Sequence, residues 1–333
     1  MKKMICLLVL VFGVCCFFSC NKKDNNEVVV YAYKSFTGEW GAGSKIAKRF
    51  EEKTGCAVRF VTTKDAGGII SRLESEKESV CADVVIGIDN YLLPKVRAKD
   101  LLVPYKPSRY DEILDKLIMS EDALLTPFDF GYFAFMYNTE SDVKPPSSLK
   151  DLTLPEYKGK IVIMDPQTST PGLGALLWMR ASYQDTYIDL WKDICANVLA
   201  MPTSWSQGYA LFKSGEVPLA ISYTTSLAAH ILYDQTDSLK PLIFEEGHIC
   251  QIEGMGIVKG APHEENAKAF LDFMLSDEAQ SELAETQFMF PVMQSVELPS
   301  SFKAVPEIKK VLSVEVGDGL IEEIVEHAIE SIK

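Results

Sequence analysis

The chain has 333 residues, 47% of them hydrophobic and 24% charged, and its formal net charge is −14. These values are typical of a globular chain that is long enough for two domains. The chain has no basic block, so nucleic acid is a poor partner, whereas the acidic balance weakly favours a cationic small molecule.

The first twenty residues predict export and a lipid anchor. A positively charged start, Met1–Lys3, precedes an apolar run, residues 4–18, that is too short to span a membrane comfortably. Residues 17–20 then resemble a lipobox, so we expect 1–20 to be a lipoprotein signal peptide and Cys20 to become the lipidated N-terminus in the periplasm. An ordinary cleaved signal peptide is the alternative. Residues 21–27 are polar and predict a flexible tether.

Strands and helices alternate in the first third of the mature chain. The pattern predicts strands at 27–33, 57–62 and 82–87, with helices at 44–54 and after Asp65 and a loop at 34–43. Gly55 supplies the stop of the first helix. This order of elements predicts a doubly wound α/β sheet, in which ligands bind beyond the carboxyl ends of the strands.

Two long apolar runs, 126–138 and 247–259, predict strands that cross between two lobes. Between them the pattern predicts strands at 160–164 and 218–222, a loop at 165–174, and helices at 175–183, 187–196 and 206–214. Helices at 266–283 and 319–332 complete the chain. We therefore expect lobe 1 to contain 28–128 and 247–333, and lobe 2 to contain 129–246. A ligand cleft is expected between the lobes.

Seven stretches, in this order, resemble the family of thiamine-binding periplasmic proteins, the solute-binding components of thiamine ABC importers. They are YAYKSFTGEWGAG (31–43), ADVVIGIDN (82–90), PFDFGYFAFMY (127–137), DPQTSTPGLGALLWM (165–179), WSQGYALFKSGE (205–216), SYTTS (222–226) and EGH (246–248). The resemblance runs from about residue 28 to 295. It implies a type II periplasmic binding protein fold and capture of thiamine, or of its mono- or pyrophosphate. It also implies a monomer that delivers this ligand to the permease of an ABC importer, with no catalytic residue, metal or cofactor.

Thiamine carries a permanently cationic thiazolium ring, which attracts Trp and Tyr rings through cation–π interactions. By resemblance, the predicted residues around the rings are Tyr33, Trp40, Trp205 and Tyr223. Asp65 is expected on the aminopyrimidine, and Ser169 and Thr170 at the hydroxyethyl or phosphate end. Phe288 stands where the family has a tryptophan, and Ala229 where it has a tyrosine. The second change predicts weaker affinity, a neighbouring aromatic in the gap or a shifted ligand preference.

Structural explanations stand beside these functional ones. Asp65 and the hydroxyls of residues 168–170 could serve only as helix caps, although Gly172 and Gly174 favour close approach of the backbone to a ligand. Asp129, on the first crossing strand, is a predicted hinge residue.

Two other functions remain open at this stage. A thiaminase-like enzyme would use a cysteine nucleophile, and a binder of another cation would take ferric iron or a polyamine. The cysteines after Cys20 show no metal-site spacing and no evident pairing: Cys56, Cys81, Cys195 and Cys250. Cys81 and Cys250 lie in strand-like sequence and are expected to be buried.

Overall fold

The computed structural model describes residues 26–38, 41–317 and 319–333. The predicted signal peptide, Cys20 and Trp40 therefore lie outside the described residues, as does most of the predicted tether. Within these ranges, none of the helices combines the length and the apolar character that a membrane span needs.

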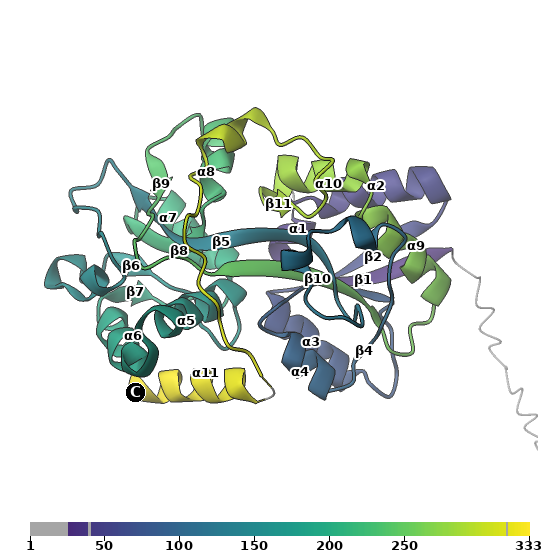
Figure 1. Ribbon diagram of the computed structural model, residues 1–333, viewed down its shortest axis with the longest axis horizontal. Coiled ribbons are helices and arrows are strands. Elements are labelled where there is room, and N and C mark those ends of the chain that lie inside the picture. Colours follow the sequence, from purple (N-terminus) through teal and green to yellow (C-terminus); the bar gives the residue numbers. More distant parts are fainter. Residues whose placement is uncertain (1–25, 39–40, 318) are drawn as a thin grey trace, which may run out of the picture.

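In the described part of the chain, eleven strands form one mixed sheet, drawn in Figure 1. Along its main path the order is β2 (Ala57–Thr63), β1 (Glu27–Tyr33), β3 (Val84–Asp89), β10 (Cys250–Val258), β5 (Thr126–Asn138), β8 (Leu219–Tyr223), β6 (Ile161–Val162) and β7 (Val198–Ala200). Three short strands pair off this path: β4 (Leu102–Val103), β9 (Leu239–Pro241) and β11 (Phe290–Pro291).

The predicted crossing strands, β5 and β10, are observed at the centre of the sheet. They pair with each other in antiparallel fashion, β10 pairs with β3 on one side, and β5 pairs with β8 on the other. Figure 1 shows these two long strands running from one half of the molecule into the other. The type II binding-protein architecture expected from the sequence is thus present, with the two halves sharing one continuous sheet.

The helices cover both faces of this sheet. The α-helices are α1 (Lys34–Thr37), α2 (Gly43–Thr54), α3 (Ala66–Ser75), α4 (Leu93–Ala98), α5 (Thr170–Tyr183), α6 (Tyr187–Cys195), α7 (Trp205–Lys213), α8 (Ser226–Ala229), α9 (Glu264–Met274), α10 (Asp277–Glu282) and α11 (Leu320–Ser331). Short 3-10 helices are η1 (Tyr110–Glu112), η2 (Asp115–Leu117), η3 (Lys150–Thr153), η4 (Pro155–Tyr157), η5 (Gln184–Thr186) and η8 (Ser300–Ala304). Two π-helical turns are η6 (His230–Asp234) and η7 (Leu283–Gln287).

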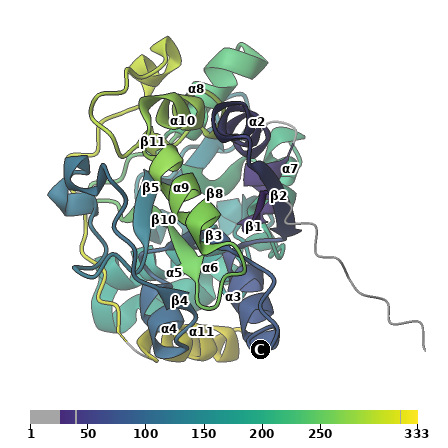
Figure 2. The same ribbon diagram turned by 90° about the vertical axis from the view of Figure 1, so that its right-hand side faces the viewer.

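Each half of the molecule has its own apolar core. In the first half, α2 and α9 pack on one face of the sheet and α3 and α4 on the other, as Figures 1 and 2 show. Strand β3 is buried along its whole length, which explains its uninterrupted apolar sequence. In the second half, Trp178 and Trp191 lie fully buried in a separate cluster.

The C-terminal helix differs from the predicted division of the chain. The predicted lobe 1 includes residues 247–333, but α11 packs against α5 and α6 of the second half. Its buried residues, Ile321, Ile324 and Ala328, belong to the apolar cluster of that half. The amphipathic pattern identified the helix correctly, but such a pattern does not specify which apolar surface the helix will cover.

Three predicted local structures are corrected. The predicted loop 34–43 contains α1, and the predicted helix 266–283 is divided into α9 and α10. The predicted loop 165–174 already contains the first residues of α5, including Gly172 and Gly174. A Cβ atom at Gly172 would lie 2.2 Å from the carbonyl oxygen of Met164, and one at Gly174 2.4 Å from the Phe133 ring. These glycines let α5 pack closely on the sheet; they do not serve the approach to a ligand predicted from the sequence.

Candidate functional site

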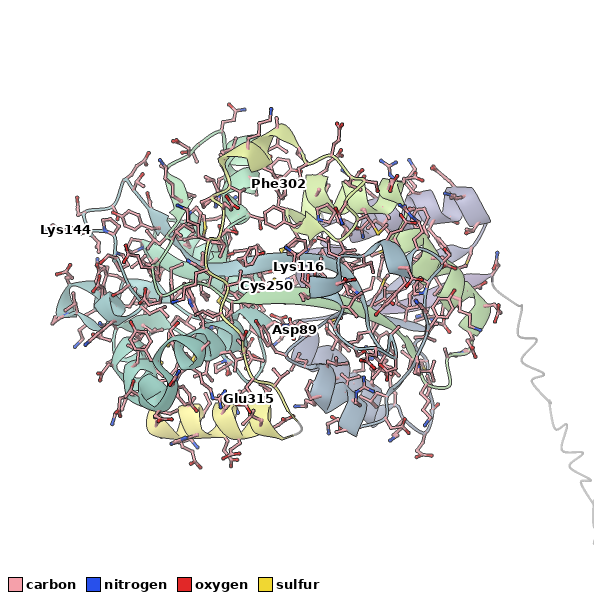
Figure 3. The ribbon with its side chains drawn as sticks, viewed as in Figure 1. Asp89, Lys116, Lys144, Cys250, Phe302 and Glu315 are labelled. Carbon is pink, nitrogen blue, oxygen red and sulfur yellow. The ribbon has the colours of Figure 1, made fainter. Side chains whose placement is uncertain are left out.

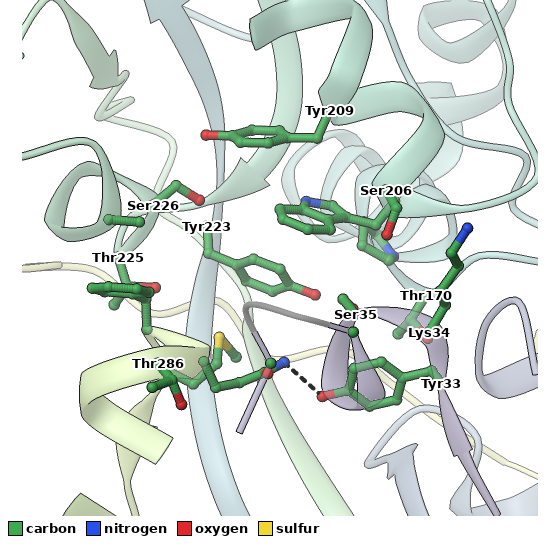
Figure 4. A pocket seen from close by; sticks show the side chains of 18 of the residues that line it. Tyr33, Lys34, Ser35, Thr170, Ser206, Tyr209, Tyr223, Thr225, Ser226 and Thr286 are labelled. Atoms are coloured by element: carbon green, nitrogen blue, oxygen red, sulfur yellow. Dashed lines mark hydrogen bonds between the residues drawn. The ribbon is translucent and has the colours of Figure 1, made fainter. Parts of the chain in front are cut away.

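A cavity of about 660 Å³ lies between the two halves of the molecule. This volume is within the range of about 300–1,000 Å³ that is typical of small-molecule sites. Its lining comes from strand ends and helix starts of both halves, including β1, α3, α5, α7 and β8. Figure 4 shows Tyr33, Tyr223 and Tyr209 one above another along this cavity.

Six of the eight predicted ligand-binding residues line this cavity: Tyr33, Asp65, Thr170, Trp205, Tyr223 and Phe288. Ser169 is buried at the N-cap of α5 and is not part of the lining, and Trp40 lies outside the described residues. The structure thus brings residues that are far apart in the sequence to one place, while their contacts with a ligand remain predictions.

Tyr33 lies at the end of β1 and is held in place by its surroundings. Its hydroxyl donates to Glu253 Oε2 at 2.8 Å and accepts from Gln287 Nε2 at 3.0 Å, the second bond being drawn in Figure 4. Its ring packs directly on Gly87, where a Cβ atom would lie 2.2 Å from Tyr33 Cδ1. Gly87 lies at an irregularity in the β3–β10 ladder. Its φ is 97°, a backbone conformation that favours glycine.

The rings on the second half are also fixed by contacts. Trp205 begins α7, stacks on Tyr209 with ring centroids 4.7 Å apart, and donates from Nε1 to Ser222 Oγ at 2.9 Å. Tyr223, at the end of β8, stacks on Phe133 at 5.0 Å. Both rings are therefore oriented before any ligand arrives, which lowers the entropic cost of binding.

Asp65 combines the two roles considered from its sequence position. Its carboxylate accepts from the N–H of Ala66 at 2.9 Å and so caps α3, yet the residue also lines the cavity. Burial raises the pKa of this carboxyl above its usual value, and the Ala66 N–H, the Ser169 hydroxyl and the N–H groups of Trp205 and Thr170 oppose the rise. Trp205 and Thr170 are the first residues of α7 and α5, so Asp65 lies opposite two helix starts of the other half.

Several polar residues of the lining were not predicted from the sequence. Gln251 and Glu253 lie on β10, where Gln251 accepts from the Tyr223 hydroxyl at 2.5 Å. His230, on η6, contacts the Tyr209 hydroxyl through Nε2 at 2.7 Å and Asp234 Oδ2 through Nδ1 at 2.7 Å. One signal was available: a glutamate in the otherwise apolar strand segment Ile252–Val258 needs a partner or a function.

The rim of the cavity carries the two departures from the family pattern. Ala229 and Phe288 both line the cavity, and so does Tyr233, one helical turn after Ala229. The Tyr233 ring meets the Phe288 ring edge-on, with centroids 5.4 Å apart. Of the three outcomes considered for Ala229, this geometry favours a neighbouring aromatic ring near the gap.

One side of the cavity is polar and carries positive charge. Lys34, Thr170 and Ser206 lie together there in Figure 4, and Lys64 also belongs to the lining. Thr170 and Ser206 belong to the first turns of α5 and α7, and helix starts favour negative charge, here that of the Asp65 carboxyl, on which the N–H groups of Thr170 and Trp205 act. The cavity thus combines acidic residues and aromatic rings with a separate side suited to negative charge.

The four described cysteines are free thiols, and none of them lines the cavity. Burial raises the pKa of Cys56 to about 11 and those of Cys195 and Cys250 to about 12, which disfavours the thiolate. Cys250 lies near the middle of the molecule on β10 (Figure 3), whereas Cys81 is exposed, contrary to the prediction that it is buried. Within the described ranges, no three His, Cys, Asp or Glu side chains are grouped as a metal site requires.

The chain is similar to several known proteins. The family model of bacterial extracellular solute-binding proteins matches residues 79–314. The chain is 38% identical over 291 residues to the thiamine-binding periplasmic protein of Brucella abortus, covering 87% of this chain and 86% of that protein. It is 36% identical over 276 residues to the protein of the same name from Escherichia coli, covering 83% and 84%. The chain belongs to the family of thiamine-binding periplasmic proteins.

A solved structure of a member of this family, a periplasmic thiamin binding protein, has a TM-score of 0.86 to this chain at 32% identity. The match covers 92% of this chain and 96% of that one. The fold is therefore that of a type II periplasmic binding protein, and the protein is an extracytoplasmic solute-binding protein.

Proposed function

We propose that this protein captures thiamine, or its mono- or pyrophosphate, outside the cytoplasm and delivers it to an ABC importer without chemical turnover. The observation that carries the proposal is the meeting of aromatic rings and buried carboxyl groups in one cavity between two halves of the fold. The names of the relatives, thiamine-binding periplasmic proteins, agree with this ligand.

The aromatic lining suits the two flat rings of thiamine. Trp205 is covered on one face by Tyr209, so its other face is available to a ligand ring. A cation over such a ring gains about 2 kcal/mol when it is desolvated. Tyr33 and Tyr223 add two further rings whose hydroxyls are already bonded, so they offer ring surface without a buried, unpaired hydroxyl.

The polar lining supplies partners for the rest of the molecule. The Asp65 carboxyl is an acceptor for the exocyclic amine of the aminopyrimidine. The side formed by Lys34, Thr170 and Ser206 takes the hydroxyethyl group or a phosphate, with Ser169 behind it. The Ser169 hydroxyl is buried and acts on the Asp65 carboxyl, whose pKa it helps to lower, so Ser169 supports this side of the cavity from behind.

Membrane attachment is a separate part of the proposal. Cys20 carries the lipid, the residues between it and β1 form the tether, and the protein works as a monomer beside its permease. Intact mass measurement of the membrane-extracted protein is expected to show acyl groups on Cys20, and Cys20→Ala is expected to release the protein in soluble form. A mature chain without lipid would leave the ordinary signal peptide as the explanation.

Titration calorimetry tests the ligand. We expect saturable binding of at least one of thiamine, thiamine monophosphate and thiamine pyrophosphate, and none of spermidine or ferric citrate. Incubation of the protein with thiamine and an added nucleophile is expected to release no free thiazole. A folded protein that gives no heat with any of the three thiamine compounds would overturn the proposal, and release of thiazole would favour the thiaminase-like enzyme instead.

A further inference from the structure

Two carboxyl side chains face each other at the base of the cavity, where the halves of the molecule join. Asp129 on β5 and Glu253 on β10 are direct partners in the antiparallel ladder of the two crossing strands. Side chains at such opposed positions lie on the same face, with Cβ atoms about 5 Å apart. Asp129 is fully buried and Glu253 is 6% exposed.

No cation compensates this pair within the described residues. Glu253 accepts from the Tyr33 hydroxyl, while neither oxygen of Asp129 has a hydrogen-bond donor there. Burial raises the pKa of Asp129 far above its usual value and that of Glu253 to about 7, and each carboxyl acts on the other. Two adjacent buried carboxyls cannot both ionise readily, so in the empty cavity Asp129 keeps a proton and donates it to Glu253.

Other acidic groups around Asp129 and Glu253 also disfavour ionisation of the pair. The ionisable groups that act on it, or that share its cavity, are Asp65 at the start of α3, Asp89 at the end of β3, Tyr33 on β1, Tyr223 on β8, Tyr209 on α7, Tyr233 on η6, Lys34, Lys64 and Lys213, and the paired His230 and Asp234. The acidic members oppose ionisation of the pair. None of the lysines forms an ion pair with Asp129 or Glu253, and Lys213 is paired with Asp234 at 3.1 Å.

The two carboxyls differ in their access to a ligand. Glu253 belongs to the lining of the cavity, whereas Asp129 lies behind it and does not. A ligand therefore meets Glu253 directly, and Asp129 acts only through Glu253.

We propose that Glu253 is the counter-ion of the ligand's cation and that Asp129 is its positioning residue, so that capture of the cation releases a proton from this carboxyl pair into solvent. The inference rests on the proposed function, because it takes the ligand to be the permanently charged thiazolium. No covalent bond is made or broken in the ligand: the cation replaces the proton as the compensating charge, and the proton goes to buffer.

This exchange makes binding depend on pH in a defined direction. A cation that favours the Glu253 carboxylate lowers the pKa of this group in the complex, so protons leave on binding at pH values below the free-state pKa of about 7. Release is expected to approach one proton per ligand near pH 6 and almost none near pH 8. Affinity is expected to rise by up to about tenfold per pH unit below pH 7 and then to level off.

Calorimetry with thiamine in buffers of different ionisation enthalpy, at pH 6 and at pH 8, counts the protons released. Glu253→Gln is expected to abolish the release and to weaken thiamine binding by at least tenfold. It is expected to weaken far less the binding of an analogue with carbon in place of the charged ring nitrogen. Asp129→Asn is expected to keep both binding and proton release, because its amide still donates to Glu253 and the released proton comes from Glu253.

Glu246→Gln is the matched control, because Glu246 also accepts a tyrosine hydroxyl, from Tyr183 at 2.8 Å, but lies outside the cavity lining. Its proton count is expected to equal that of the wild type, including any uptake by the ligand's own ring nitrogen. Tight wild-type binding with the same proton count at pH 6 and pH 8 and a pH-independent affinity would overturn the inference. The proposed function would survive that result, whereas it fails if no thiamine compound binds at any pH.

Discussion

The base and the rim of the cavity are built in different ways. At the base, Tyr33, Glu253 and Asp129 lie on strands whose backbones are fixed by pairing within the sheet, and all three are buried. At the rim, Tyr233 lies on the π-helical turn η6 and is 46% exposed. On the proposed function, charge is recognised where side chains are fixed, because desolvated electrostatics depend most on position. Ring contacts at the rim tolerate more adjustment.

The largest effect is expected from disturbing the base. In Gly87→Ala, the new methyl group would lie 2.2 Å from the Tyr33 ring, on a backbone with a φ of 97°. Tyr33 must move, and its hydrogen bond to Glu253 is lost with it, so we expect thiamine affinity to fall by about 100-fold or more. Calorimetry measures the affinity, and circular dichroism checks that the variant is folded.

Gly55→Ala is the control that distinguishes the cost of backbone strain from the effect of displacing Tyr33. Gly55 also has a positive φ, 72°, but a Cβ atom there has nothing within 4 Å. We expect a loss of stability of roughly 1 kcal/mol with unchanged affinity. If Gly87→Ala bound thiamine as Gly55→Ala does, the base would not be a rigid part of the site.

The next largest loss of affinity is expected from a change in the cavity wall that α7 forms. Trp205→Ala removes the ring that stacks on Tyr209 and faces the cavity, and we expect an affinity loss of about 10- to 30-fold, in line with a desolvated cation–π contact. Trp205→Phe is expected to lose less. Trp191→Phe, in the core of the second half, is the control, and its affinity is expected to stay at the wild-type value.

The buried acids predict how stability depends on pH. Burial raises the pKa of Asp89 to about 8, of Glu253 to about 7 and of Asp129 further, so the folded protein holds protons that the unfolded chain has released. Stability conferred by these groups is present at low pH and is lost as pH rises through 7 to 8. Burial lowers the pKa of His230 and His248, so their contribution to stability is complete above about pH 6.5 and is lost only at lower pH, which leaves this window unaffected.

Thermal unfolding of the ligand-free protein between pH 6.5 and 8 tests this linkage. We expect a fall in Tm of a few degrees, corresponding to about 1–2 kcal/mol, with a shallower fall in Asp129→Asn. A Tm that rises over this range would mean that the pair at the base is already ionised in the folded protein.

The fold could be predicted because its signals are local. The apolar run of β3, the long strand β5 and the stop at Gly55 each correspond to a pattern of a few residues, and the crossing strands follow from their length. The partner of α11 could not be read in this way, since an amphipathic face fits either half. The start of α5 was missed because its glycines resemble a loop until the packing of Met164 and Phe133 is known.

Part of the cavity lining could also be predicted, because some of its residues have local signals in the sequence. Residues at the ends of strands, such as Tyr33 and Tyr223, are recognisable because parallel strands end at one edge of the sheet. Glu253 lies in the middle of β10 and faces Asp129 only through the register of the two crossing strands. A register between segments more than a hundred residues apart is set by the whole sheet, so the carboxyl pair required the structure.

The smallest effect is expected at the rim. Tyr233 meets Phe288 edge-on and lines the cavity near Ala229, but half of its side chain remains exposed to water. A partly solvated ring gains only about 0.5–1 kcal/mol from a cation, so Tyr233→Ala should weaken thiamine binding two- to fivefold and Tyr233→Phe very little. Leu232→Ala is the matched control, because Leu232 is equally exposed but outside the lining. A loss in Tyr233→Ala as large as in Trp205→Ala would mean that the rim closes over the ligand and becomes as dry as the wall, and the contrast between base and rim would then hold only for the empty protein.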